Sequence, residues 1–114
     1  MRIKINHKGK KIGIDVKNTN LWTRGLGLMF RTQKTNNLLF DFSEDKNLSL
    51  TGLFVFFDFL ILWLDKDNNV LEWRIGKPFE FSIKTKKKFR RIVEIPVDVK
   101  NMKIIEFFVG KRKV

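Results

Sequence analysis

The chain has 114 residues and a formal net charge of +12, with no cysteine and a single histidine. The length favours one domain, which we expect to span residues 1–114. Without cysteine there are no disulfides and no thiolate metal sites, and one histidine argues against a histidine-based metal site. We therefore expect no metal and no cofactor. Twelve Phe and three Trp residues supply the apolar volume for a substantial core.

The positive charge is concentrated towards the two ends of the chain. Residues 1–34 carry a net charge of +8, residues 35–72 carry −5 and residues 73–114 carry +9. Such an excess favours a polyanionic partner, such as nucleic acid. An AT-rich genome gives a similar composition, rich in Lys, Asn, Ile and Phe, so the charge alone leaves a purely compositional origin open.

We expect neither a signal peptide nor a membrane span. Apolar and charged residues alternate from the start, and no apolar segment of the signal-peptide type follows. The longest apolar run, "LFVFFDFLILWL" over residues 53–64, is twelve residues long and includes Asp58. A membrane-spanning helix needs about 20 apolar residues. We expect a cytoplasmic protein, whose oligomeric state the sequence does not indicate.

The first expected element is a β-hairpin. Apolar residues alternate with polar ones over residues 3–5 and 12–16, and a glycine-containing turn over residues 7–10 separates them. The break at residues 18–20 can cap a short helix over residues 21–30. Two glycines inside that helix would each cost about 1 kcal/mol.

Strands are expected next over residues 38–42, 49–57 and 59–64. The last two form two strands or one long bent strand, broken near Asp58. Their apolar runs are continuous rather than alternating, which predicts burial on both faces of a sheet.

A turn is expected next over residues 65–69, because Asp and Asn tolerate left-handed φ. A strand over residues 70–75 then pairs with the strand before this turn and completes a hairpin. Residues 84–91, "KTKKKFRR", predict a solvated strand or loop, and strands follow over residues 92–96 and 103–109. The fold class is mainly β, all-β to α+β, as a compact small barrel-like or sandwich-like sheet with one or two short helices.

Four motifs occur along the chain. They are "GLMFR" at residues 27–31, "NLLFDF" at 37–42, "ILWLDKDNNV" at 61–70, and "RIVEIP" at 91–96 with a later Val109-Gly110. In order and spacing they resemble the small prokaryotic family called domain of unknown function 192, or uncharacterised protein family 0127. The resemblance implies a compact, mostly β domain with one or two short helices. It implies no reaction, because the family has no settled activity.

The chain departs from that family at two places. Residues 51–58 are mostly apolar where relatives often carry a polar-aromatic segment, and Gly110 is followed by Lys111 rather than Asp. A site built from those polar residues in relatives would be lost or altered here.

The segment "TRGLGLMFRT" around the first motif resembles a phosphate-binding loop only superficially. It lacks the third glycine of a dinucleotide loop and the Gly-Lys-Ser/Thr of a P-loop, so we interpret its glycines as structural. Its arginines, Arg24 and Arg31, can bind an anion or pair with acids such as Asp41. Asp58 needs a partner if it is buried, or marks a strand bend if it faces water. Arg24, Arg31 and Asp58 are therefore the candidate ligand-binding residues.

A basic segment near the C-terminus is the candidate nucleic-acid face. Its residues are Lys84, Lys86, Lys87, Lys88, Phe89, Arg90 and Arg91. Exposed tryptophans could stack on bases beside it, although no DNA- or RNA-reading motif is present. A solvated surface without a partner is the alternative, and clustering of the charges in space would favour binding.

No catalytic residues can be assigned, because the one histidine, His7, falls in a predicted hairpin turn. We expect a non-enzymatic binding or accessory module for an anionic or small ligand. The alternatives are a nucleic-acid-binding protein that uses the basic face, and a minor enzyme with an Asp/Arg pocket.

Overall fold

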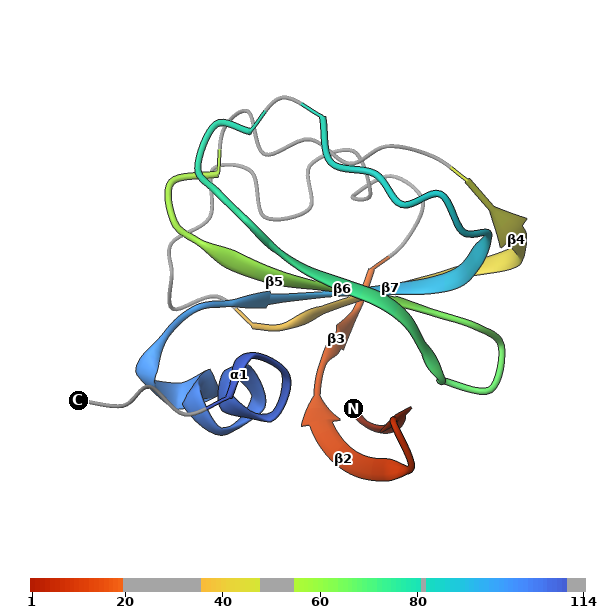
Figure 1. Cartoon of the computed structure of the whole chain (residues 1–114), viewed down its shortest axis with the longest axis horizontal. Coiled ribbons are helices and arrows are strands. Elements are labelled where there is room, and N and C mark those ends of the chain that lie inside the picture. The colour runs from red at the N-terminus through yellow and green to blue at the C-terminus, as the bar shows by residue number, and fades with distance from the viewer. Residues whose placement is uncertain (20–35, 48–54, 81, 111–114) are drawn as a thin grey trace.

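The computed structural model describes residues 1–19, 36–47, 55–80 and 82–110. Within these ranges the chain forms a five-stranded sheet, a separate two-stranded hairpin and a C-terminal helix (Figure 1). The helix expected over residues 21–30 lies outside the described residues.

The strands of the main sheet follow an order different from their order in the chain. The separate hairpin consists of β1 (Arg2–His7) and β2 (Lys10–Asp15). The main sheet has the order β3 (Lys17–Asn18), β4 (Leu38–Lys46), β7 (Phe89–Pro96), β5 (Phe59–Leu64) and β6 (Val70–Gly76). Only β3 and β4 pair in parallel among these neighbours. A 3₁₀ helix, η1 (Val99–Asn101), leads into α1 (Met102–Val109). The mainly β class with a short helix is thus confirmed.

The hairpin is confirmed where the alternation predicted it. Ile5 and Ile14 are fully buried on its inner side, while polar neighbours face solvent. The turn places Lys8 at φ 51° and Gly9 at φ 78°. Two successive positive φ values match the right-handed twist of the flanking strands, and glycine adopts such a φ without strain.

The sheet carries an apolar cluster on each face. The upper core comprises Leu38, Phe40, Phe42, Val55, Phe57, Phe59, Ile61, Trp63, Ile83, Phe89 and Ile92. The lower core comprises Ile5, Ile14, Val16, Leu39, Leu60, Leu62, Leu64, Val93, Ile95, Ile105 and Phe108. All six residues of β5 are buried, which confirms the expected burial on both faces.

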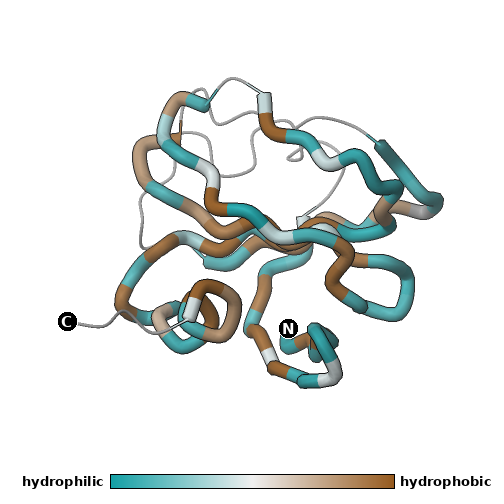
Figure 2. The backbone as a smooth tube through the Cα atoms, viewed as in Figure 1, coloured by the Kyte–Doolittle hydropathy of each residue, from teal (hydrophilic) through white to brown (hydrophobic). Residues whose placement is uncertain are grey.

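The hairpin and α1 lie together on one side of the main sheet, below it in Figure 1, against the lower core. The connection from β6 to β7 runs along the other side. Figure 2 shows the apolar residues concentrated along the central strands and the hydrophilic ones in the connections. The two sides of the sheet therefore present different surfaces.

The predicted turn after β5 is confirmed, and it is built around one carboxylate. Asp65 accepts hydrogen bonds from the backbone N–H groups of Asp67 and Asn69, both at 2.9 Å, and from the Asn69 amide at 3.0 Å. Partial burial alone would raise the pKa of Asp65, but these hydrogen bonds and the charge of Arg91 outweigh it and lower the pKa. Asn68 takes a φ of 63°, as Asn tolerates.

The strand expected over residues 103–109 is wrong, because this segment forms α1. The apolar residues of α1 recur three and four positions apart, and this places Ile105 and Phe108 against the lower core. The Asp98 side chain accepts a hydrogen bond from the Val99 N–H at 2.6 Å and starts the preceding 3₁₀ turn. Burial of a helical stripe outweighs the β propensity of Ile, Phe and Val.

Candidate anion-binding surface

The predicted pocket of Arg24, Arg31 and Asp58 can be followed only at Asp58, because both arginines lie outside the described residues. Asp58 precedes β5, and its carboxylate forms an ion pair of 2.9 Å with Lys77 Nζ. The Asp58 side chain is 39% exposed. Its backbone carbonyl accepts a hydrogen bond from the Val97 N–H at 2.9 Å. Asp58 is therefore a surface carboxylate at a bend before the strand.

The aromatic member of the basic segment does not face solvent. Phe89 is fully buried in the upper core, where its ring meets Phe42 edge-on with centroids 5.9 Å apart. The placement of Phe89 in the candidate nucleic-acid face is therefore wrong. Trp63 is fully buried as well, and Trp73 packs partly buried against the lower core. Trp22 lies outside the described residues.

The two arginines of the basic segment are engaged with acids of β4. Arg90 pairs with Asp45 at 3.2 Å, and Arg91 pairs with Asp41 at 3.1 Å. Arg91 also donates to the Lys66 carbonyl at 2.7 Å, which ties β7 to the turn after β5. These arginines fasten neighbouring elements together, and their charges are locally balanced.

The four lysines of the segment are all exposed, and we call them the basic loop: Lys84, Lys86, Lys87 and Lys88. Buried residues alternate with them, since Ile83 lies in the upper core and Thr85 is buried. Thr85 Oγ1 donates to Glu72 at 2.7 Å, and Thr85 accepts from the Lys87 N–H at 3.2 Å. The loop is thus anchored to β6, to which Lys87 Nζ also donates a hydrogen bond at the Leu71 carbonyl (2.7 Å). Its backbone runs on the side of the sheet away from α1 (Figure 1).

The lysines of the basic loop form no ion pair with the acidic side chains that the structure describes. Six acidic side chains form ion pairs in the described ranges: Asp15, Asp41, Glu44, Asp45, Asp58 and Glu80. Each of their basic partners lies outside the basic loop. Four positive charges therefore stand within five residues of chain without an ion pair to any described acid.

An exposed aromatic pair stands beside the same connection between β6 and β7. Phe56 and Phe79 are 58% and 55% exposed, and their rings meet edge-on with centroids 5.3 Å apart. Phe79 has a φ of 63°, which is strained for a bulky side chain. This pair was not predicted from the sequence. The adjacent Gly-Lys-Pro break, which ends the strand and turns the chain outward, is the signal that could have indicated it.

The histidine is engaged in packing. The His7 ring lies 5.0 Å from the Phe108 ring and 6.2 Å from the Phe107 ring, between centroids. Burial and the neighbouring charge of Lys8 both lower the pKa of His7, so its neutral form predominates at pH 7. In the described part of the chain, no group of three or more His, Asp or Glu side chains is placed to hold a metal ion.

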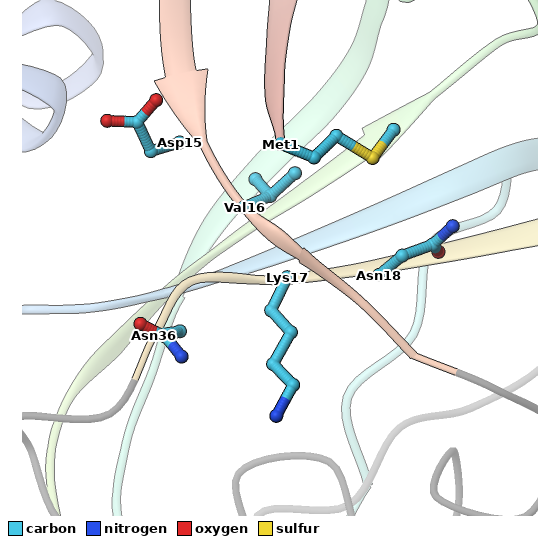
Figure 3. Close-up of a pocket in the computed structure, with 6 residues that line it drawn as sticks. All are labelled: Met1, Asp15, Val16, Lys17, Asn18 and Asn36. Carbon is cyan, nitrogen blue, oxygen red and sulfur yellow. The ribbon is translucent and has the colours of Figure 1, made fainter.

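Open cavities lie on the other side of the sheet, and two of them adjoin the strand that leaves the hairpin. Figure 3 shows the larger, of about 370 Å³, with Asp15 and Asn36 on one side of the chain and Met1 and Asn18 on the other. Asp15 also lines the second, of about 290 Å³, which extends towards η1 and α1. This side therefore offers small polar recesses, whereas the basic loop offers exposed charge.

These features define a small, mainly β domain with a charged, aromatic-edged loop on one side of its sheet. A model of the family described as "Uncharacterized ACR", domain of unknown function 192, matches residues 1–106. The chain belongs to this family, which confirms the resemblance of the four motifs. No curated protein sequence matches the chain significantly.

Two solved structures share the fold. One, from Sinorhizobium meliloti 1021 and described as a "putative transcription regulator", has a TM-score of 0.73 at 19% identity, over 90% of this chain and 82% of that one. The other is a protein of unknown function from Novosphingobium aromaticivorans DSM 12444. It has a TM-score of 0.74 at 12% identity, over 90% of this chain and 76% of that one. At such identities the likeness shows the fold alone. Among the described residues, no helix has the length and apolarity to cross a membrane.

Proposed function

We propose that the protein is a non-enzymatic binding module for a polyanionic ligand. The observation that supports this most is the basic loop, whose four exposed lysines have no described acid as an ion-pair partner. Exposed ammonium groups held close together repel one another, and a polyanion relieves that repulsion while it releases its own counterions.

The anchoring of the basic loop supports a polyanion-binding surface rather than a solvated surface without a partner. Thr85 and Ile83 fix the backbone between the lysines, so little backbone order has to be gained on binding. Glu72, the acid that contacts the loop, accepts a hydrogen bond from Thr85. Asp58 pairs with Lys77, and His7 packs against Phe108 of α1 on the other side of the sheet.

A second candidate ligand is single-stranded nucleic acid, and the exposed Phe56–Phe79 pair favours it. Bases stack on exposed aromatic rings, and each stacked base contributes about 1–3 kcal/mol. Phe79 and the basic loop both lie in the connection between β6 and β7. A single-stranded nucleic acid lying along that connection would therefore meet both the aromatic rings and the lysine charges. The relative from Sinorhizobium meliloti is described as a "putative transcription regulator", and at 19% identity its description stays with that protein.

The test is fluorescence anisotropy with a labelled oligothymidine of about twelve nucleotides and an abasic strand of the same length. The two probes carry equal charge, and only the first has bases. We expect both to bind, with log K falling linearly as log salt rises. No measurable binding of either probe at about 50 mM salt would contradict the proposal.

The same assay decides between the two ligands. Stacking of bases on the pair predicts that oligothymidine binds at least about tenfold more tightly than the abasic strand. It also predicts that the double variant Phe56→Ala/Phe79→Ala loses this difference while its affinity for the abasic strand stays unchanged. Equal binding of the two probes means that the ligand is recognised by charge alone, and it excludes stacking of bases on the Phe56–Phe79 pair.

A further inference from the structure

The connection from β6 to β7 begins with a tight turn over residues 77–80, "KPFE". The Glu80 N–H donates to the Lys77 carbonyl at 3.2 Å and closes this turn. Pro78 occupies its second position, and Phe79 occupies its third position with a φ of 63°. These are the features of a type II turn, whose third position needs a positive φ and is normally filled by glycine or asparagine. Phe79 therefore stands where the backbone favours a residue without a bulky side chain.

Burial in the core does not offset the strain at Phe79. Its ring is 55% exposed, and it meets edge-on the ring of Phe56, which is itself 58% exposed. A positive φ is strained for a bulky side chain, and such strain persists only where the surrounding structure enforces it. Strained residues of this kind cluster at positions that hold a ligand. The exposed ring of Phe79 is therefore a candidate for direct contact with one.

Glu80 fixes this strained turn through two separate contacts. Its Oε1 accepts a hydrogen bond from the Lys77 backbone N–H at 3.1 Å, and its Oε2 forms an ion pair with Arg74 of β6. The ion pair of 2.9 Å between Lys77 Nζ and Asp58 ties the turn to the residue before β5. The turn is thus held to both strands of the β5–β6 hairpin, so the ring it carries loses little freedom when a ligand binds.

The basic loop indicates what covers the exposed ring. Lys84 follows Phe79 by five residues, so the Cα atoms of the two residues are at most about 18 Å apart. A strand of about twelve nucleotides, with about 3.4 Å or more between neighbours, is long enough to lie on both. Its bases offer flat faces to the ring, and its phosphates meet the lysines. In a duplex those faces are already stacked and paired, so only unpaired nucleotides can use the ring.

We propose that Phe79 is a specificity-determining residue that favours unpaired bases over a duplex, and that Glu80 is the positioning residue that holds its ring in place. This inference rests on the nucleic-acid candidate of the proposed function and adds to it the selection of single strands. The ring of Phe79 gains contact only with bases, whereas the basic loop meets any phosphate backbone. The ratio of the affinities for oligothymidine and for the abasic strand therefore measures the effect of both residues separately from charge.

The first test compares Phe79→Gly with Phe79→Ala by urea denaturation. Both variants lose the ring, and at an ordinary exposed position glycine is the less stable of the two because it has more freedom in the unfolded chain. At a φ of 63° we expect the opposite order, with the higher urea midpoint for Phe79→Gly, because glycine adopts this conformation without strain. A higher midpoint for Phe79→Ala would show that the turn stores no strain, and it would overturn the proposal.

The second test measures fluorescence anisotropy with oligothymidine, the abasic strand and a duplex of about twelve base pairs. We expect Phe79→Gly and Glu80→Ala each to lose most of the about tenfold advantage of oligothymidine over the abasic strand. Phe79→Gly should leave the affinities for the duplex and for the abasic strand unchanged. The matched control is Glu44→Ala, which removes the same charge and an exposed ion pair with Lys46 from β4, and which should keep the advantage.

The outcomes separate this inference from the proposed function. Failure of both single strands to bind the unmodified protein would contradict the proposed function, and this inference with it. Equal binding of the two strands would leave recognition by charge in place and would overturn the selection of unpaired bases. An advantage retained in Glu80→Ala, an equal loss in Glu44→Ala, or a loss of duplex affinity in Phe79→Gly as large as that of oligothymidine would overturn the roles assigned to Glu80 and Phe79.

Discussion

Changing all four lysines of the basic loop to glutamine is expected to weaken oligothymidine binding by about 100-fold or more at about 50 mM salt. Each lysine that neutralises a phosphate of a single strand releases about 0.7 counterion, so the slope of log K against log salt should become shallower by about 3. The side chains are exposed, and the substitution also removes the hydrogen bond that Lys87 Nζ donates to the Leu71 carbonyl. Anisotropy across a salt series measures both quantities.

A second variant serves as the charge-matched control. The hairpin also exposes four lysines: Lys4, Lys8, Lys10 and Lys11. Their joint change to glutamine removes the same charge from the other side of the sheet. We expect affinity and slope to fall far less in this control. Equal losses in the two variants would show that net charge, and not the basic loop, governs binding.

Replacing Phe89 by alanine is expected to lower the free energy of unfolding by about 3–5 kcal/mol. The ring is fully buried in the upper core, and the change removes its edge-on packing with Phe42 and leaves a cavity. Phe89 also begins β7, which pairs with both β4 and β5 near the centre of the sheet. Urea denaturation followed by tryptophan fluorescence measures the difference.

Phe79→Ala is the matched control for this prediction. The same ring is removed from a side chain that is 55% exposed, so little buried surface is involved and the cost should stay below about 1 kcal/mol. A comparable loss of stability in the two variants would contradict the burial of Phe89 and would indicate that its side chain is exposed with the basic segment.

The parts of the fold that depend on local pattern could be predicted from the sequence. The hairpin follows from alternating apolar residues around Gly9, and the turn after β5 from Asp65 and Asn68. The burial of β5 follows from an uninterrupted apolar run. In each case the residues that decide the structure are close neighbours in the chain.

Where two local preferences compete, the sequence was ambiguous. The residues of α1 favour strands individually, yet their spacing of three and four positions places Ile105 and Phe108 on one helical stripe. Phe89 stands among six basic residues, and only the pairing of β7 with its neighbours shows that its side chain points inward. Tertiary packing decided both outcomes.

The candidate sites were predictable only in part. The basic loop is visible as a run of lysines, but its anchoring depends on the hydrogen bond between Thr85 and Glu72. The recess on the α1 side joins Arg2, Asn37 and Lys100, which are far apart in the chain.

NMR mapping of oligothymidine binding on the unmodified protein tests the proposed function most directly. We expect the largest amide shifts, saturating with the oligonucleotide and reversed by salt, to fall on residues 84–88 of the basic loop. Shifts centred instead on the hairpin turn at residues 8–11, or spread evenly over exposed lysines, would contradict the proposal.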